Sequence, residues 1–422
     1  MTRGRIISRP AFWLLLSAIS AASMGYYVSA IWSANQPAHF SDFYAPWWAA
    51  HELLLHGRDP YSPAVAHEIQ RVIYDAPVAP AADDPNGVAG GFAYPPYATL
   101  FLWPLIYVAF PTAQKIFVFL SVFLTLLSLA LWLHAVRLRL SPLSRLTVAF
   151  FVLGSFPVLQ ALKLQNLSLL AAAFVAITLS LLSGNQFALA GIFLAASTFK
   201  PQFTVVLIPW LLLWTFADWP RRRSLVVSFL ATLSLLVLLG EWLAPGWIPN
   251  FLQVVNAYRH YTYGHSLLDV WFAPTFGPVA SVGLLLGALA LCWPHRSEAA
   301  DAPRFLLATS LLLAANVAVI PTLAPHAQLL LLPGFLCLMP AINARWISTS
   351  FARVLRAAVW MLTAWPWAAA FGLCLAGLWL PVARLYRFWQ VPLYTSPLLP
   401  MAVWLALAFL VRAGSTPDNP QV

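Results

Sequence analysis

MTRGRIISRPAFWLLLSAISAASMGYYVSAIW, residues 1–32, is the stretch that decides the class of fold. Its basic flank and apolar run resemble a secretory signal, but the run extends from Ala11 to Trp32 and is longer than the apolar core of a usual signal. A helix needs about 20 apolar residues to cross a hydrocarbon layer about 30 Å thick. We therefore expect an uncleaved first membrane span.

The same apolar character continues through the chain, of which 61% is hydrophobic and only 9% charged over 422 residues. The 20 Trp and 34 Pro also suit spanning helices and their interfaces. The sequence predicts an all-α polytopic membrane protein with a bundle of about twelve transmembrane helices. The apolar segments lie at roughly 11–33, 114–136, 146–163, 167–183, 187–200, 203–217, 224–243, 270–293, 305–321, 327–342, 354–380 and 397–412.

The basic residues indicate topology. The net charge of +10 is divided among short clusters between apolar segments and forms no single basic stripe, which argues against nucleic acid as a partner. With the N-terminus in the cytoplasm, most arginine clusters fall inside and most of the 13 acidic residues fall outside. We therefore expect an integral protein of the bacterial plasma (inner) membrane, with its polar chemistry facing the periplasm or exterior.

One apolar segment conflicts with a simple span count. Residues 94–110, YPPYATLFLWPLIYVAF, are short and contain Pro95, Pro96 and Pro104, and a crossing here would invert every later loop. We expect this segment to be re-entrant or to lie at the interface, where protein covers its backbone.

We treat residues 1–422 as a single transmembrane domain, with a first outer loop at 34–113 and the remaining bundle at 114–412. Within the loop, residues 44–57 predict a helix on the membrane surface, with Glu52 and His56 away from its apolar face. A second helix is expected at 63–75, followed by a flexible loop at 76–91 in which Asp83 and Asp84 are solvated.

Four motifs then follow one another in a distinctive order. They are SDFYAPWWAAHELLLHGRDPY at 41–61, YPP at 94–96, KLQNLSLL at 163–170 and AGIFLAASTFKPQ at 190–202. Together with the first span, this order resembles the bacterial membrane glycosyltransferases of the GT-C fold that use polyprenyl-phosphate sugars. The chain looks most similar to the polyprenol-phosphate-mannose-dependent mannosyltransferases, and the ordered resemblance covers about the first 220 residues.

The resemblance implies an inverting transfer of a sugar from a polyprenyl-phosphate carrier to an acceptor hydroxyl at the outer face. The acceptor would be a glycan, a glycolipid or a protein, and a pentose is the second choice after mannose for the donor sugar. The acid after the first span would be the catalytic base, and Asp42 occupies that place. Leu164 departs from the family, which usually has glycine in this motif, so the backbone role of the KLQN loop is open.

The chemistry explains why one carboxylate suffices. A polyprenyl phosphate is already a competent leaving group, so its transfer does not need the second carboxyl of a glycosidase. Asp42 would only accept the proton of the attacking hydroxyl. The alternative is that Asp42 caps the helix that begins near Phe43, which is a common role for Asp at that position.

The departing phosphate needs a fixed cation. Candidates at the outer ends of spans are Lys163, Lys200, Arg259, Arg384 and Arg387, and we prefer Lys200 and Arg259 as a pair. The competing interpretation is that Lys200 extends to the interface and Arg259 anchors the aromatic loop there. The side chains expected to bind sugar or acceptor are Tyr44, Gln165, Asn166, Tyr258, His260 and His326. Polar groups at span ends also often satisfy only the backbone.

We expect no cofactor and no required metal, because the sequence has no Asp-x-Asp pair and no cluster of ligand spacing, and its three cysteines lie in apolar runs. Asp59 is expected to fix the turn before Pro60. The rival function is a membrane transporter or lipid flippase without covalent chemistry. It predicts ionisable groups at mid-membrane, whereas here they gather at span ends.

Overall fold

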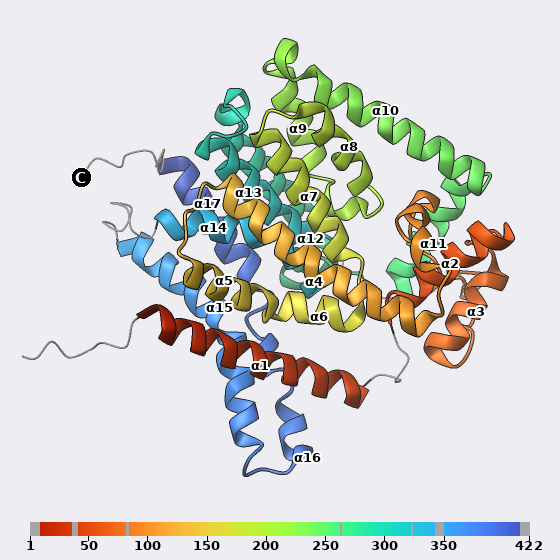
Figure 1. The fold of residues 1–422 in the computed structure, drawn as a ribbon, viewed down its shortest axis with the longest axis horizontal. Helices are drawn as coiled ribbons and strands as arrows, with labels where there is room; N and C mark the ends of the chain where they lie inside the picture. The colour runs from red at the N-terminus through yellow and green to blue at the C-terminus, as the bar shows by residue number, and fades with distance from the viewer. Residues whose placement is uncertain are drawn as a thin grey trace, which may run out of the picture.

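The computed structural model describes residues 9–35, 41–81, 84–261, 264–321, 324–341 and 350–413. Over these residues the chain is helical, and two-stranded pairing is limited to one isolated bridge between Ala81 and Asp84 (Figure 1). The α-helices are α1 Arg9–Asn35, α2 Tyr44–His56, α3 Pro63–Tyr74, α4 Phe110–Ala135, α5 Pro142–Leu153, α6 Phe156–Leu164, α7 Ser168–Ser183, α8 Phe187–Ser197, α9 Leu207–Phe216, α10 Trp219–Leu243, α11 Trp247–Tyr261, α12 Leu267–Cys292, α13 Pro303–Val319, α14 Leu332–Ala341, α15 Ser350–Ala376, α16 Val382–Leu385 and α17 Leu399–Ala413. Short 3-10 helices are η1 Pro96–Phe101, η2 Trp103–Leu105, η3 Pro201–Phe203, η4 Trp293–Ser297, η5 Pro325–Leu331, η7 Tyr386–Phe388 and η8 Val391–Leu393.

The membrane-spanning helices fall into two classes. Among the described residues, five helices are long and apolar enough to cross a membrane, or six when the bent pair α5 and α6 counts as one span. Six further apolar helices of 10–17 residues account for other apolar segments of the sequence. The chain is an all-α polytopic membrane protein, as predicted. It has five or six spans of full length, where the segment count predicted about twelve.

The bent span places the end of α6 at the first outer loop. Its two halves meet at 58° across the break at Gly154 and Ser155, and Pro157 follows in the first turn of α6. Gly154 is in contact with Ala21 of α1, so a side chain at this position would collide with the neighbouring helix. The close crossing of α1 therefore explains why a residue without Cβ stands at the break.

The interior of the bundle is built on α7 and α13, most of whose residues are buried. α7 packs between α4 and α8, and α13 packs against α12 and α17. α8 lies against α10 so closely that a Cβ on Gly191 would meet Ser228 and the Leu225 carbonyl. These contacts fix the position of the segment after α8, which carries Lys200.

The two helices predicted in the first outer loop are present, and Gly57 ends α2 in the left-handed conformation with φ of 64°. However, α2 is largely buried inside the protein, and Glu52 is only 4% exposed because it bonds to Arg58. The expectation that Glu52 faces away from the packed side is therefore wrong. Segment 94–110 forms only η1 and η2, in agreement with the prediction that it is not a spanning helix.

The described part of the loop at 76–91 is more regular than its composition suggests. Asp84 is buried, and its two carboxylate oxygens accept the backbone N–H groups of Val88 at 3.0 Å and Ala89 at 2.8 Å. Gln70 of α3 donates to the carbonyls of Gly87 and Ala89. The prediction that Asp84 is solvated is thus wrong, while Asp83 lies outside the described residues.

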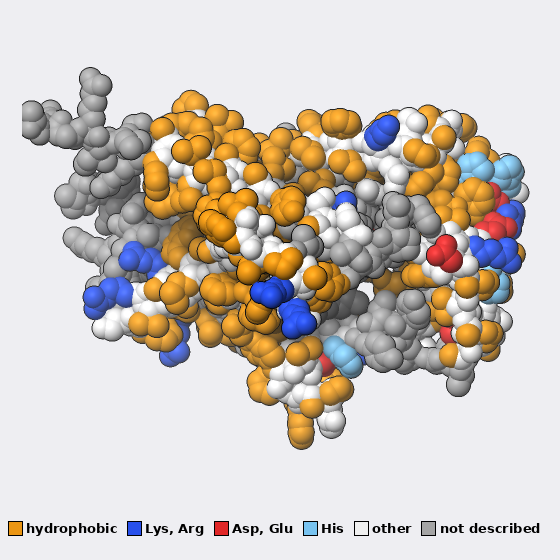
Figure 2. Space-filling model, turned by 90° about the horizontal axis from the view of Figure 1, so that it is seen from below, with side chains coloured by type: hydrophobic (Ala, Val, Ile, Leu, Met, Phe, Trp, Pro, Cys, Tyr) orange, Lys and Arg blue, Asp and Glu red, His pale blue; other side chains and the backbone are white. Residues whose placement is uncertain are grey.

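The two ends of the bundle differ in surface chemistry. Figure 2 shows a mostly hydrophobic face on which acidic and histidine side chains are concentrated toward the end that carries α2 and α3 in Figure 1, whereas basic side chains also lie over the rest of the face. Phe43, just before α2, stacks on Phe110 and Phe117 at the start of α4. The N-terminal end of α4 therefore lies at this polar end, and its C-terminal end lies at the opposite end of a helix about 39 Å long.

Candidate active site

Asp42 is held by its backbone at the junction of α6 and α7. Its N–H donates to the carbonyl of Leu164, the last residue of α6, at 2.8 Å. Any residue supplies that carbonyl, so this bond does not depend on the side chain of Leu164. The N-cap of α2 is Phe43 and has no side-chain cap bond. The carboxylate of Asp42 is therefore not engaged as a helix cap.

The turn between α6 and α7 presents Asn166 to Asp42. Gln165 adopts the left-handed conformation, with φ of 53° and ψ of 45°, and the N–H of Asn166 returns to the Ala161 carbonyl at 2.8 Å. This reversal ends α6 and directs the Asn166 side chain inward, where it is 6% exposed. Its Nδ2 donates to Oδ2 of Asp42 at 2.7 Å.

The other side of the Asn166 amide binds a lysine. Nζ of Lys200 donates to Oδ1 of Asn166 at 2.7 Å, and Ser168 donates to the same oxygen through its N–H and its hydroxyl. Lys200 is only 4% exposed, so the interpretation that it merely extends to the interface is wrong. Asp42, Asn166 and Lys200 form one chain of hydrogen bonds between a carboxylate and an ammonium group.

Aromatic rings surround the ammonium group. Nζ of Lys200 lies 5.9 Å from the ring centroid of Tyr94 and 5.5 Å from that of Phe203, within the range of cation–π attraction. Tyr94, which begins the YPP motif, was not among the side chains expected at the site. The charge of Asp42 also acts on Tyr94, and so does Tyr258 of α11. The first outer loop and α11 therefore meet at the site.

Burial shifts both ionisable groups toward neutral pH. Desolvation raises the pKa of the Asp42 carboxyl above its ordinary value, against the hydrogen bond of Asn166 and the charge of Lys200. Desolvation also lowers the pKa of Lys200 to about 7, against the charge of Asp42. A carboxylate with a raised pKa is a better proton acceptor at neutral pH, and a lysine near its pKa changes charge readily.

His326 approaches the same lysine from η5. It interacts electrostatically with Lys200, and its Nδ1 is buried without a hydrogen-bond partner in the part of the chain that the structure describes. Buried polar atoms are normally paired, so an unpaired one beside a lysine indicates a place for a ligand. The site thus combines a carboxylate, an ammonium group, an unpaired imidazole nitrogen and aromatic rings.

A site of this composition in a bundle of membrane helices agrees with the family to which the chain is similar. Residues 92–339 match the family described as Glycosyltransferase family 87. The chain belongs to glycosyltransferase family 87. It is therefore a membrane glycosyltransferase. No curated protein and no solved structure matched the chain.

The family match covers Asn166, Lys200 and His326 of the glycosyltransferase but begins after Asp42. The position of Asp42 in the site consequently depends on the structure, through its bonds to Leu164 and Asn166.

Two of the predicted sugar-binding side chains make structural contacts in the glycosyltransferase. Oε1 of Gln165 accepts from the hydroxyl of Ser41 and from Nε2 of Gln114 at 3.0 Å, so it ties the first loop to α4. Tyr44 is buried in an aromatic cluster with Trp48 and Phe110, and burial, followed by the charges of Glu68 and Glu52, raises the pKa of its hydroxyl. The structure brings neither of these side chains into a hydrogen bond with Asp42 within the described ranges.

The remaining predicted cations lie apart from the hydrogen-bonded chain. Lys163 is half-buried one turn before Asn166, and Arg259 is exposed near the end of α11. Among the described residues neither bonds to Asp42, Asn166 or Lys200. The pairing of Lys200 with Arg259 thus stays a prediction. His260 lies in α11, but its side chain falls outside the described part.

One group of side chains in the first loop has the composition of a metal site. The ligand atoms of His51, Glu52 and His56 all lie within 4.8 Å of one another. However, one Glu52 oxygen binds Arg58 at 2.5 Å and the other lies 3.1 Å from His51. Because the guanidinium already neutralises Glu52, this group is an ion-pair cluster, and it makes no bond to Asp42 among the described residues. Asp59, as predicted, accepts the N–H of Tyr61 and fixes its turn.

Proposed function

We propose that this glycosyltransferase transfers a sugar, with inversion, from a polyprenyl-phosphate carrier to an acceptor hydroxyl at the outer face of the bacterial plasma membrane. One observation carries the proposal. Asn166 joins the Asp42 carboxylate to the Lys200 ammonium group by hydrogen bonds of 2.7 Å on each side. A base and a cation are thereby held a fixed distance apart, as attack and departure at one carbon require.

In the proposed reaction Asp42 accepts the proton of the acceptor hydroxyl. The freed oxygen attacks the anomeric carbon from the face opposite the phosphate, so a new glycosidic bond forms with inverted configuration. Asn166 occupies Oδ2 of Asp42 and leaves Oδ1 for the acceptor. A general base in this role contributes roughly 10²–10⁴ in rate.

The bond between the anomeric carbon and the phosphate oxygen breaks in the same step. Its electron pair stays on the polyprenyl phosphate, which gains one negative charge. Lys200 receives that charge in a site sheltered by Tyr94 and Phe203, and Nδ1 of His326 supplies a further polar contact. Tyr258, half-exposed beside Tyr94, is placed to pack against a sugar ring.

The identity of the donor sugar rests on the sequence resemblance, which favours mannose, with a pentose second. The acceptor is a hydroxyl of a glycan, glycolipid or protein. The polyprenyl carrier also rests on the resemblance; the site itself supports a phosphate leaving group, because a cation beside one carboxylate suits such a group better than an alkoxide, which would need a second acid.

The test is turnover of purified protein with a panel of synthetic polyprenyl-phosphate sugars and candidate acceptors. Wild type should consume at least one donor, and Asp42→Asn should lower its rate by roughly 10²–10⁴. The matched control is Asp59→Asn in the same loop. Asparagine at that position keeps the oxygen that accepts the N–H of Tyr61, so the control should retain nearly full activity.

Two results would overturn the proposal. Donor consumption that is unchanged in Asp42→Asn would remove Asp42 as the base. If the protein turned over nucleotide sugars and no polyprenyl-phosphate sugar, the proposed polyprenyl-phosphate donor would be wrong, although the protein would still be a glycosyltransferase.

A further inference from the structure

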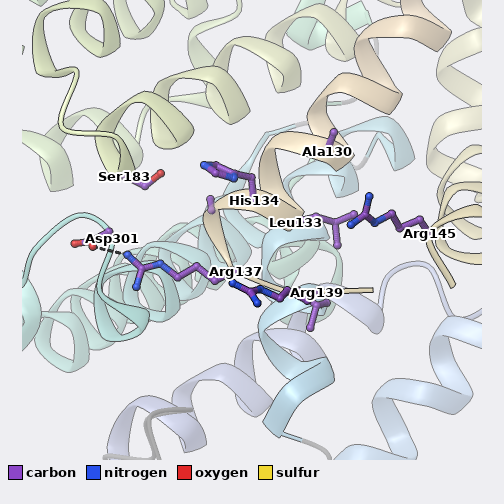
Figure 3. A pocket seen from close by; sticks show the side chains of 10 residues that line it. Ala130, Leu133, His134, Arg137, Arg139, Arg145, Ser183 and Asp301 are labelled. Carbon is purple, nitrogen blue, oxygen red and sulfur yellow. Dashed lines mark hydrogen bonds and ion pairs between the residues drawn. The ribbon is translucent and has the colours of Figure 1, made fainter. Parts of the chain in front are cut away.

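A second polar region lies at the end of α4 opposite the Asp42 site. There the structure contains a cavity of about 590 Å³, bordered by the last turns of α4, the segment that leads into α5, the end of α7 and the connection before α13. Figure 3 shows its polar side chains. They are His134, Arg137, Arg139, Arg145, Ser183 and Asp301.

The cavity carries more positive charge than its own groups neutralise. Arg137 pairs with Asp301 at 2.6 Å, whereas Nε of Arg145 donates only to the backbone carbonyl of Leu140 at 3.1 Å. Arg139 makes no hydrogen bond or ion pair with any residue that the structure describes. Three guanidinium groups therefore face one carboxylate, and two of them have no anionic partner among the residues that the structure describes.

The backbone at the end of α4 supports a role for these side chains. Arg137 has φ of 56°, a left-handed conformation that glycine or asparagine usually provides at a helix end. Its N–H donates to the carbonyl of His134, and the N–H of Leu138 donates to that of Leu133. An arginine in this conformation is unfavourable unless its side chain is needed there. Arg139 follows this turn and Arg145 lies in the first part of α5, and Figure 3 shows Arg139 between Arg137 and Arg145 at the border of the cavity.

The cavity also has an apolar wall formed by Ala130, Leu133 and Leu138. α4 is one of the spanning helices, so its last turn lies where hydrocarbon gives way to head groups. Guanidinium groups bind phosphate through paired N–H donors, and basic pockets between spanning helices suit anionic head groups. We propose that this cavity binds the phosphate head group of an anionic membrane lipid, with the first carbons of its chains against the apolar wall.

The proposal is independent of the chemistry at Asp42, and its test measures binding. Delipidated protein in an uncharged detergent is titrated with dioctanoyl phosphatidate, and bound lipid is counted by native mass spectrometry. The double variant Arg139→Gln/Arg145→Gln should bind at least about tenfold more weakly than wild type, since it removes two charged phosphate contacts. Both arginines are exposed, and equal thermal stability of the lipid-free proteins establishes that the variant folds.

The matched control is Arg221→Gln/Arg223→Gln, which removes the same charge near the same end of the bundle. Arg221 bonds to Asn185, two residues after Ser183, and neither control arginine lines the cavity. Its affinity should stay within about twofold of wild type, because exposed charges outside the cavity add little to a specific contact.

Three outcomes would overturn the proposal. Equal weakening in both double variants would indicate general attraction to a basic surface. Equal binding of dioctanoyl phosphatidylcholine would rule out recognition of the anionic head group. Competition by inorganic phosphate at the same concentration as the lipid would identify a site for free anions and remove the lipid as its occupant.

Discussion

Two groups of charged side chains lie at the polar end of the molecule, and they handle charge in different ways. In the first loop, Arg58 binds Glu52 at 2.5 Å and Glu68 at 2.7 Å, so opposite charges neutralise each other directly. At the junction of α6 and α7, Asn166 separates Asp42 from Lys200. In the first group the charges are paired directly with each other. In the second group the carboxylate and the ammonium group are not in direct contact, so each remains available to a substrate.

The pKa values follow the same division. The hydrogen bond from Arg58 lowers the pKa of Glu68, which keeps that carboxylate ionised and unreactive. Burial raises the pKa of Asp42 and lowers that of Lys200 to about 7. The comparison teaches that burial shifts the pKa values of a carboxylate and an ammonium group toward neutral pH where a neutral amide keeps them from a direct ion pair, whereas such a pair holds a carboxylate ionised.

After Asp42→Asn, the largest effect in this comparison is expected from Lys200→Met, which removes the cation of the reactive group while keeping an unbranched side chain. Turnover should fall by roughly 10²–10³, the usual cost of losing a preorganised group that stabilises transition-state charge. Steady-state assays measure it, with whichever donor of the polyprenyl-phosphate-sugar panel wild type consumes. Equal loss from Lys163→Met, a half-buried lysine outside the hydrogen-bonded chain, would contradict the assignment to Lys200.

A smaller loss is expected from Asn166→Leu, which keeps the approximate volume and breaks both hydrogen bonds of the connecting amide. Asp42 and Lys200 remain, but their relative position is no longer fixed, so turnover should fall by roughly 10². The matched variant is Gln165→Leu, whose amide bonds to Ser41 and Gln114 and not to the two charged groups. If Gln165→Leu lost more activity than Asn166→Leu, the amide bridge would not be the feature that matters.

The smallest effect on turnover is expected from Glu52→Gln in the neutralised group. Removing a buried carboxylate that binds Arg58 and His51 should cost roughly 1–3 kcal/mol of stability, because hydrogen bonds to charged groups have that magnitude. Thermal unfolding should therefore begin several degrees lower, while turnover of the folded enzyme stays close to wild type.

Glu68→Gln provides the matched comparison, since Glu68 is less buried and its loss should destabilise less. Turnover of folded Glu52→Gln that fell as far as that of Asn166→Leu would erase the distinction between the two groups.

Much of the fold was accessible from the sequence because apolar length and basic clusters report spans and orientation directly. The helices of the first loop were also predictable, since Gly57 and Pro63 mark their ends. Span number was not, because several buried helices of 10–17 residues have the composition of a span without its length. The burial of Glu52 and Asp84 was equally hidden, since it depends on partners that only the folded loop supplies.

The candidate site divides in a similar way. Asp42 and Lys200 were predicted as base and cation, but Asn166 was expected to touch sugar, and only the fold places its amide between them. The sequence did not indicate a role for Tyr94 beyond its position before Pro95. Its contact with Lys200 forms only in the folded chain, because the two residues are about a hundred positions apart in sequence. The contribution of Arg259 still depends on a measurement.

The most direct test of the division between reactive and neutralised charge is the pH dependence of kcat/KM for the donor in wild type and in Lys200→Arg, over about pH 5 to about pH 9. Activity should rise with pH as Asp42 loses its proton and fall again as Lys200 loses its own near pH 7. Arginine keeps its charge throughout, so the variant should retain the acidic limb and lose the alkaline one. An alkaline limb that persists unchanged in Lys200→Arg, or a wild-type profile without an acidic limb, would contradict the account.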